Sequence, residues 1–400
     1  ATPEQELAYA LATAIAVLDD LRAKVPAKDF PAMVGRISFF VNAGIRFVTE
    51  ICKMRAFVEM WDDLCQSRYG ITEERHRRFR YGVQVNSLGL TEQQPENNVA
   101  RILIEMLAVT LSKNARARAV QLPAWNEALG LPRPWDQQWS LRMQQILAYE
   151  TDLLEYADIF DDNPAIAAKV AALKASALEE LAQIDAMGGA VAAIPHMKSR
   201  LVEANSDRLG RIERGEQVVV GVNRYREAEP SPLTAGIDSI FTTDPAAEAD
   251  QITRLHTWRA ERDGVAVNRA LLRLREAALS GENIMPPSIA AAKAGVTTGE
   301  WGAAIRAAFG EYRAPTGVNP AASNRTEGLE PIRAAVDLVS SRLGRRLKLL
   351  IGKPGLDGHS NGAEQITARA RDCGMAIHYD GIRHTPADIV AQALEENPHV

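Results

Sequence analysis

The sequence predicts an α/β fold, in which strands alternate with helices and neighbouring strands run parallel. Three observations support this prediction. Residues 1–160 contain three units of apolar strand, polar loop and amphipathic helix; residues 161–335 are Ala-rich and mostly helical; and residues 336–400 return to the strand–helix alternation. Because 46% of the residues are hydrophobic and 24% are charged, the chain can form substantial buried cores.

The first block begins with a helix predicted over residues 4–24, which has Pro3 at its start and Pro26 after its end. The strands and helices that follow are predicted at 36–44, 45–66, 81–89, 95–111, 116–123 and 136–157. This order is typical of a (β/α)8 barrel, which needs eight such units, or of a doubly wound sheet. Three units alone would leave a parallel sheet with uncovered edges, so we expect either a small open sheet or part of a larger one.

The middle block is predicted to contain one strand, at residues 216–225, and a last helix within 295–312. Residues 313–331 are rich in Pro, Gly, Ser and Asn, which is typical of a linker. After it we expect a helix, two strand–helix pairs and the start of a further strand, at residues 331–342, 346–352, 360–373, 375–379, 386–396 and from His399.

That last block is typical of the opening of a flavodoxin-like or Rossmann-like domain, whose sheet normally has about five strands. Since only two strands precede the end of the chain, we predict that the chain is a fragment, cut at both ends and inactive by itself.

Composition restricts the possible functions. A net charge of -5 gives no support for nucleic-acid binding. The three cysteines, Cys52, Cys65 and Cys373, have no C-x-x-C spacing, which favours the reducing cytoplasm over a disulfide framework or a zinc site. No run approaches the ~20 apolar residues that a membrane span requires.

One loop carries the strongest chemical signal, the stretch "KPGLDGHSNG" at residues 353–362. It lies between a predicted strand and helix, where open α/β sheets bind their ligands. His359 can offer one ring nitrogen to a metal while Asp357 fixes the other, and Lys353 can keep that carboxylate ionised. The glycines leave room for a large flat group. A single protein ligand suits a metal whose other ligands come from a corrin or a porphyrin. The alternative is that His359 is a solvated loop residue, as most histidines in loops are.

These residues resemble the cobalamin-binding signature of the adenosylcobalamin-dependent acyl-CoA mutases, the methylmalonyl-CoA mutase family. The resemblance extends over essentially the whole chain, through the segments "RISFFVNAGIRFVTEICKMRAFVEMW", "LTEQQPENNVARILIEMLA", "LPAWNEALGLP" and "VVVGVNRY". It implies that residues 1–160 are the second half of an acyl-CoA-binding (β/α)8 TIM barrel. Residues 161–335 would connect this half-barrel to residues 336–400, the truncated start of a flavodoxin-like cobalamin-binding domain.

The resemblance also implies an activity, a radical isomerisation of the carbon skeleton of an acyl-CoA. Two segments, "RFRYGVQVNSLGL" and "ARAVQLPAWNEALGLPRPWDQQWSLR", resemble the branch that acts on ethylmalonyl-CoA more than the branch that acts on methylmalonyl-CoA. Methylmalonyl-CoA as substrate, or a non-catalytic cobalamin-binding chain, are the alternatives. The implied cofactor is adenosylcobalamin with its cobalt, the implied substrate is an acyl-CoA, and the full-length protein is expected to be a cytoplasmic homodimer.

The resemblance assigns roles to individual residues. His359 would be the axial cobalt ligand, supported by Asp357 and Lys353, and Arg36 and Ser38 would contact the acyl-CoA. The residues implied to bind the cofactor are Gly358, His359, Ser360, Asn361, Glu127, Gly130, Leu131 and Ser87.

Two of these assignments have structural alternatives, and a third departs from the family pattern. Arg36 could form a salt bridge at the rim of the barrel, and Glu127 could be a charge at a helix N-terminus. Ser87 stands where the family usually has a Gly. The basic run at residues 73–82 could steer CoA phosphates or be a solvated loop.

Overall fold

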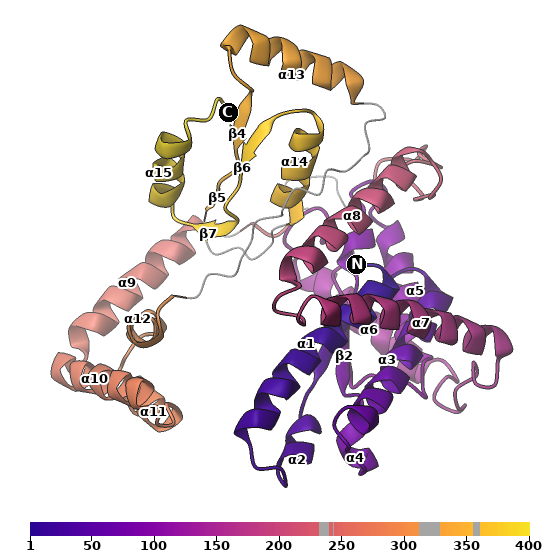
Figure 1. Ribbon diagram of the computed structural model, residues 1–400, viewed down its shortest axis with the longest axis horizontal. Coiled ribbons are helices and arrows are strands. Elements are labelled where there is room, and N and C mark those ends of the chain that lie inside the picture. Colours follow the sequence, from indigo (N-terminus) through magenta and orange to yellow (C-terminus); the bar gives the residue numbers. More distant parts are fainter. Residues whose placement is uncertain (232–239, 243, 312–328, 355–360) are drawn as a thin grey trace. The chain divides into compact units, whose positions relative to one another are not determined.

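The computed structural model describes residues 1–231, 240–242, 244–311, 329–354 and 361–400 (Figure 1). It is a mixed α/β structure whose strands pair in parallel, which confirms the predicted α/β class. The chain divides into two compact units, Ala1–Phe241 with Thr316–Val400, and Thr242–Pro315. No helix among the described residues combines the length and the apolar character needed to cross a membrane.

The first sheet contains three parallel strands in chain order, β1 (Phe39–Ala43), β2 (Tyr81–Val85) and β3 (Ala119–Gln121). Their register places Val41 beside Val83, and Val83 beside Val120. Side chains alternate between the two faces, so Tyr81, Val83 and Val85 are buried while Gly82 and Gln84 are half-buried on the other face. This alternation confirms the predicted strands, although each is shorter than expected.

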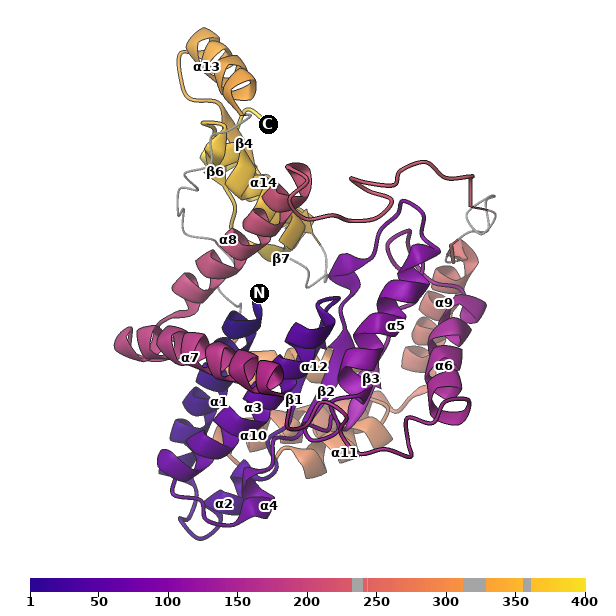
Figure 2. The same ribbon diagram turned by 90° about the vertical axis from the view of Figure 1, so that its right-hand side faces the viewer.

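Three amphipathic helices lie along the sheet, α1 (Pro3–Lys24), α3 (Phe47–Ser67) and α5 (Asn97–Thr110) (Figure 2). A capping box starts α1, in which Thr2 accepts from the N–H of Gln5 and the Gln5 side chain accepts from the N–H of Thr2. The predicted helices at 4–24, 45–66 and 95–111 are thereby confirmed within two residues at each end.

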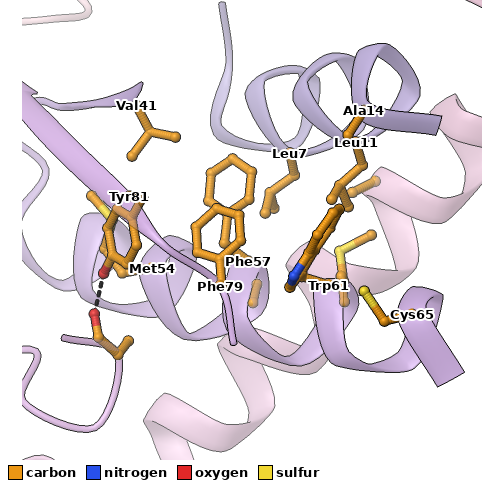
Figure 3. Packing of buried hydrophobic residues seen from close by; sticks show 14 of the residues in the cluster. Leu7, Leu11, Ala14, Val41, Met54, Phe57, Trp61, Cys65, Phe79 and Tyr81 are labelled. Carbon is orange, nitrogen blue, oxygen red and sulfur yellow. Dashed lines mark hydrogen bonds between the residues drawn. The ribbon is translucent and has the colours of Figure 1, made fainter. Parts of the chain in front are cut away.

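Aromatic side chains fill the core between α3 and the sheet (Figure 3). Phe57 stacks on Phe79 with ring centroids 5.1 Å apart, and Trp61 meets Phe39 edge-on at 5.0 Å. Leu7 and Leu11 of α1 close the same core and are almost fully buried. Such aromatic pairs contribute roughly 0.5–1.5 kcal/mol beyond the area that they bury.

The segments between these elements are short helices and turns: α2 (Phe30–Val34), α4 (Glu74–Arg77) and the 3-10 turn η1 (Ser87–Gly89). The next helix, α6, spans Pro134–Tyr149, and residues 150–157 form turns. The prediction of a helix through residue 157 was therefore too long, because "ETDLLEYA" continues the apolar spacing, whereas the helical hydrogen bonds end at Glu150.

Two long helices follow, α7 (Pro164–Ala186) and α8 (Ile194–Glu213). The predicted strand at residues 216–225 is wrong: these residues form a turn with one isolated bridge between Val220 and Arg224. Asn223 determines this turn, since its side chain accepts from the N–H of Val219 and donates to the carbonyl oxygens of Ile212 and Gln217. The apolar run "VVVGV" resembles a strand, but it has no neighbouring strand within the described residues.

The second unit is helical and contains α9 (Pro245–Glu261), α10 (Gly264–Ser280), α11 (Met285–Lys293) and α12 (Thr298–Phe309). Helix α12 begins with a capping box formed by Thr297 and Glu300, and Arg262 binds the Glu300 carboxylate at 2.7 Å. The helix predicted within 295–312 is confirmed. Most of the predicted linker lies outside the described residues.

The C-terminal segment begins with α13 (Glu330–Leu343) and contains two parallel strand pairs. The first pair is β4 (Lys348–Leu350) with β6 (Ala376–His378), and the second is β5 (Lys353–Pro354) with β7 (Ile382–His384). The helices are α14 (Asn361–Asp372) and α15 (Pro386–Glu396), as predicted. Beyond them, the N–H groups of His399 and Val400 both donate to the Lys348 carbonyl oxygen, so the chain end runs beside β4.

Candidate functional site

A backbone hydrogen bond just after β2 connects the carboxyl ends of β1 and β2. The Asn86 N–H donates to the Ala43 carbonyl oxygen at 2.8 Å, and the Asn86 side chain accepts from the N–H of Leu88 at 2.9 Å. This cap starts the turn η1, whose first residue is Ser87. Ser87 is half-buried and follows the end of β2, where parallel α/β folds place their ligand-binding residues.

After β3, residues 122–133 form a turn that carries three predicted site residues. Glu127 and Leu131 are exposed, and Gly130 is half-buried between them. Glu127 precedes α6 by seven residues and its N–H donates to the Ala124 carbonyl oxygen, so it is not the N-terminal charge of a helix. That role belongs to Asp136, in the first turn of α6.

A buried polar network supports this turn. Asp136 is fully buried and accepts hydrogen bonds from Trp125 Nε1 at 3.2 Å, from Asn126 Nδ2 at 2.9 Å and from the Arg133 N–H at 2.8 Å. Burial opposes ionisation of Asp136, but the bonds from Arg133 and Asn126 hold the pKa of its carboxyl below the ordinary value. The ionised carboxylate thus joins both ends of the turn to α6.

The turn also contains a buried amide oxygen without a partner and a glycine that lies close to a neighbouring side chain. Asn126 Oδ1 is buried and has no hydrogen-bond partner within the described residues. Gly130 has φ +151, and a Cβ added there would lie 3.1 Å from Ile240 Cδ1. Only Gly fits this conformation together with so close an approach.

A second buried network lies at the carboxyl end of β1. Lys53 of α3 is 2% exposed, and its ammonium group contacts Glu6 Oε2 at 2.6 Å, Glu50 Oε2 at 2.6 Å and the Asn42 carbonyl oxygen at 2.7 Å. Burial alone would lower the pKa of Lys53, but the two carboxylates raise it, so the group stays charged. The Glu6 carboxylate also accepts from the N–H of Asn42, which fixes α1 to the edge of β1.

Glu105 of α5 lies next to this network. It is 1% exposed, and its Oε2 has no hydrogen-bond partner among the described residues. Burial, together with the Glu50 charge, raises the pKa of Glu105 to about 8. Glu105 is therefore protonated at neutral pH, directly below the turn η1, where its Oε1 would lie 3.7 Å from a Cβ on Gly89.

The predicted acyl-CoA residues lie at the opposite end of the strand. Arg36 and Ser38 precede β1 and are both exposed. The structure records no ion pair for Arg36 among the described residues, so the alternative of a rim salt bridge has no support there. These two residues are thus separated from Ser87 and Glu127 by the length of the sheet.

The predicted cobalt-binding loop lies largely outside the described residues, which end at Pro354 and resume at Asn361. Asp357, Gly358, His359 and Ser360 belong to the undescribed part. The flanks agree with the predicted position, since Lys353 lies in β5 and Asn361 begins α14. A Cβ added at Gly362 would meet nothing within 4 Å, so the first turn of α14 is open at this position.

Sequence reasoning missed the polar residues of these networks: the half-buried Glu6 and the buried Glu50, Lys53, Glu105, Asn126 and Asp136. A signal was present for Lys53, which stands among the apolar residues Ile51, Cys52 and Met54 with Glu50 three positions earlier. No comparable signal marked Glu105 or Asn126, because their burial depends on how the helices and turns pack.

Comparison with known proteins gives a consistent result. The family model described as methylmalonyl-CoA mutase matches residues 1–311. Ethylmalonyl-CoA mutase of Cereibacter sphaeroides is 76% identical over 400 residues, which is 100% of this chain and 61% of that protein. Ethylmalonyl-CoA mutase of Methylorubrum extorquens is 64% identical over 405 residues, which cover 59% of it.

A more distant relative, the methylmalonyl-CoA mutase of Cereibacter sphaeroides, is 31% identical over 404 residues, which cover 99% of this chain and 55% of that protein. The chain therefore spans about 60% of the length of the ethylmalonyl-CoA mutases that it matches. With a family model matching more than three quarters of its residues, the chain belongs to the methylmalonyl-CoA mutase family.

Proposed function

We propose that the full-length protein is an isomerase that interconverts ethylmalonyl-CoA and methylsuccinyl-CoA. One observation carries this proposal: the two relatives named ethylmalonyl-CoA mutase are 76% and 64% identical to the chain, whereas a relative named methylmalonyl-CoA mutase is 31% identical. The difference holds over nearly the same stretch of residues, so it reflects divergence between branches of one family. Methylmalonyl-CoA is the alternative substrate.

We also propose the finer architecture. Residues 1–160 would be the second half of a TIM barrel, residues 161–335 a connecting region, and residues 336–400 the start of a flavodoxin-like cobalamin-binding domain. The parallel order of β1, β2 and β3 with helices between them supports the first part. The parallel pairs β4–β6 and β5–β7 support the last.

The proposed cofactor is adenosylcobalamin, with His359 as the axial cobalt ligand and Asp357 and Lys353 behind it. Gly358, Ser360 and Asn361 would line the corrin. On the barrel side, Ser87, Glu127, Gly130 and Leu131 would face the cofactor, since all four follow the carboxyl ends of β2 or β3. The open space at Gly362 supports a large group beside α14.

The bound cofactor supplies the radical that starts the rearrangement of the carbon skeleton. The protein's own residues bind the cofactor and the acyl-CoA and orient them. The exposed Glu127 carboxylate can accept from two ribose hydroxyls, and Arg36 with Ser38 can hold the acyl-CoA through a cation and a hydroxyl. The buried networks around Asp136 and Lys53 keep the turns after β1 and β3 in place, so that the reacting groups meet in a fixed geometry.

The axial-ligand assignment is tested with the full-length protein and added cobalamin. His359→Ala should abolish the spectral signature of a protein imidazole bound to cobalt, whereas His256→Ala, which changes an exposed His of α9, should preserve it. If the His359→Ala protein keeps the axial nitrogen signal, the assignment is wrong.

A non-catalytic cobalamin-binding chain is the remaining alternative, and turnover separates it from a mutase. A full-length protein that binds cobalamin but moves no label between ethylmalonyl-CoA and methylsuccinyl-CoA would support that alternative. The proposed homodimer is checked by the mass of the same protein in solution.

A further inference from the structure

A fully buried side chain connects the two turns that are proposed to face the cofactor. Asn98 lies in the first turn of α5 and is 0% exposed. Its Nδ2 donates to the Thr91 carbonyl oxygen and to the Trp125 carbonyl oxygen, each at 2.9 Å. Thr91 follows the turn η1 after β2, whereas Trp125 belongs to the turn after β3. One amide group therefore joins turns that follow different strands.

The hydrogen-bonding capacity of this amide is completely used. Asn98 Oδ1 accepts from the Thr91 N–H at 3.1 Å and from Arg101 Nη1 at 2.7 Å. Together with the two bonds from Nδ2, these make two donor and two acceptor bonds, which is all that an asparagine side chain can form. A side chain without the amide would leave the Thr91 and Trp125 carbonyl oxygens without this partner.

The helix that carries Asn98 is itself packed against both strand ends. Ile102 and Met106 of α5 are 0% exposed and belong to one apolar cluster with Val85 at the end of β2 and Trp125 after β3. Side chains in such a core have few alternative positions, because the interior is close-packed. Asn98 therefore projects from a fixed support between the two turns.

Arg101 extends the connection to a third turn. It lies one helical turn after Asn98 and donates to Thr91 Oγ1 and to the Val220 carbonyl oxygen, both at 2.8 Å. Val220 belongs to the turn at residues 216–225, which follows α8. Arg101 thereby holds Thr91 from a second direction, and Asn98 connects Thr91 to the turn after β3.

We propose that Asn98 is a positioning residue for the reaction, which sets the distance between Ser87 in one turn and Glu127 in the other. Ser87 lies four residues before Thr91, and Glu127 lies two residues after Trp125. This role rests on the proposed function, in which both turns face the cofactor. Groups on two separate turns cooperate only when their distance is fixed, and a displacement of about 1 Å can cost on the order of a hundredfold in rate.

The first test separates kcat from KM in the full-length protein with adenosylcobalamin and ethylmalonyl-CoA. Asn98→Ala removes all four bonds, whereas Asn98→Asp keeps the shape and an acceptor for Arg101 but removes both donors. We expect each variant to lower kcat by about tenfold or more. KM for the acyl-CoA should change by less than about threefold, because Arg36 and Ser38 precede β1 at the other end of the sheet. Equal kcat in the wild type and both variants would overturn the proposal.

The control for general destabilisation is Asn163→Ala, which removes the N-cap of α7. The Asn163 side chain accepts from the N–H groups of Ala165 at 2.9 Å and Ile166 at 3.4 Å, so its loss weakens a helix end away from the turns. Thermal unfolding measures how much stability each variant loses, and the control should keep the wild-type kcat. A fall in kcat for the control equal to that of the Asn98 variants would also overturn the proposal.

The second test does not depend on turnover. Hydrogen–deuterium exchange of the full-length protein is followed by mass spectrometry in peptides that cover residues 86–91 and 122–131. Exchange should be faster in both peptides for Asn98→Ala and Asn98→Asp, and unchanged for Asn163→Ala. Faster exchange in only one turn, or in neither, would show that Asn98 does not connect them. If the wild type isomerises no ethylmalonyl-CoA while both turns exchange faster in the Asn98 variants, the proposed function is wrong and the connection stands.

Discussion

At the scale of single residues, buried charged side chains outside the proposed ligand-binding sites contribute most to the stability of the fold. Lys53 connects α1, β1 and α3 through Glu6, Asn42 and Glu50, all within 2.7 Å of its ammonium group. A buried cation of this kind is costly to remove, since its carboxylate partners then stay buried without compensation. The position of the first strand's carboxyl end thus depends on one side chain.

Lys53→Met in the full-length protein should lower the free energy of unfolding by about 3–5 kcal/mol, because Glu6 and Glu50 lose their buried partner. Urea unfolding followed by tryptophan fluorescence measures this loss. The matched control is Lys174→Met, whose ion pairs with Glu59 and Asp63 lie near the surface and should contribute under about 1 kcal/mol. Equal losses in the two variants would contradict the role of Lys53.

Glu105 makes stability depend on pH. The pKa of Glu105 is about 8 in the folded protein, against 4.5 for an unperturbed carboxyl. Between pH 4.5 and pH 8, therefore, Glu105 is protonated in the folded state and ionised in the unfolded state. The free energy of unfolding therefore falls as pH rises from 4.5 to 8, and the full penalty is present above pH 8.

Glu105→Gln keeps the shape but cannot ionise, so the variant should be more stable than the wild type by about 4 kcal/mol at pH 8, and by much less at pH 5. Urea unfolding at pH 5, 6.5 and 8 measures the difference. Glu92→Gln, at an exposed position, is the control and should show no such trend. A pH-independent difference for Glu105→Gln would mean that Glu105 is ionised in the folded protein.

At the scale of elements, the packing of α15 in the C-terminal segment depends on how closely the backbone at Gly352 approaches this helix. A Cβ added at Gly352, between β4 and β5, would lie 2.6 Å from Ile389 Cγ2 of α15. The Ile389 atom sits on a branched carbon near the helix backbone, so it cannot move away without moving α15. Only glycine allows this helix to rest on the strands.

Gly352→Ala should therefore destabilise the full-length protein by about 1–3 kcal/mol, as overpacking does elsewhere. Thermal unfolding of the variant and the wild type measures this. Gly362→Ala in α14 is the matched control, since its Cβ meets nothing within 4 Å and Ala favours a helix by up to about 1 kcal/mol. If Gly352→Ala were as stable as Gly362→Ala, α15 would not pack as described.

The sequence predicts elements well where their periodicity is strong and poorly where side chains replace backbone pairing. The helix at 4–24 follows from apolar spacing and proline boundaries, the helix at 45–66 follows from apolar spacing alone, and the structure confirms both. Residues 216–225 have the composition of a strand, yet Asn223 bonds three backbone groups and turns the chain instead. Such a side-chain turn leaves no trace in hydrophobic patterning.

The candidate site was predictable in part for a similar reason. Ser87 and Glu127 were assigned to the site by the resemblance to the family, and the structure places both in turns that follow strand ends. The Asp136 network and the protonated Glu105 depend on contacts between α5, α6 and the turns, which the order of residues does not reveal.

At the scale of the whole molecule, the two ends of one small sheet carry different chemistry. Polar turns and buried carboxylates lie at the carboxyl ends of β1–β3, whereas Arg36, Arg80 and Arg118 precede these strands at their amino ends. The proposed acyl-CoA substrate likewise has two chemically different ends, a reacting acyl group and a set of phosphates.

The central claim is the substrate of the full-length protein, and turnover with added adenosylcobalamin tests it directly. Ethylmalonyl-CoA and methylmalonyl-CoA are supplied separately, and the isomerised products are quantified to obtain kcat/KM for each. We expect a clear preference for ethylmalonyl-CoA, with methylsuccinyl-CoA as product. A higher kcat/KM for methylmalonyl-CoA, or no isomerisation of either substrate by protein that binds the cofactor, would contradict it.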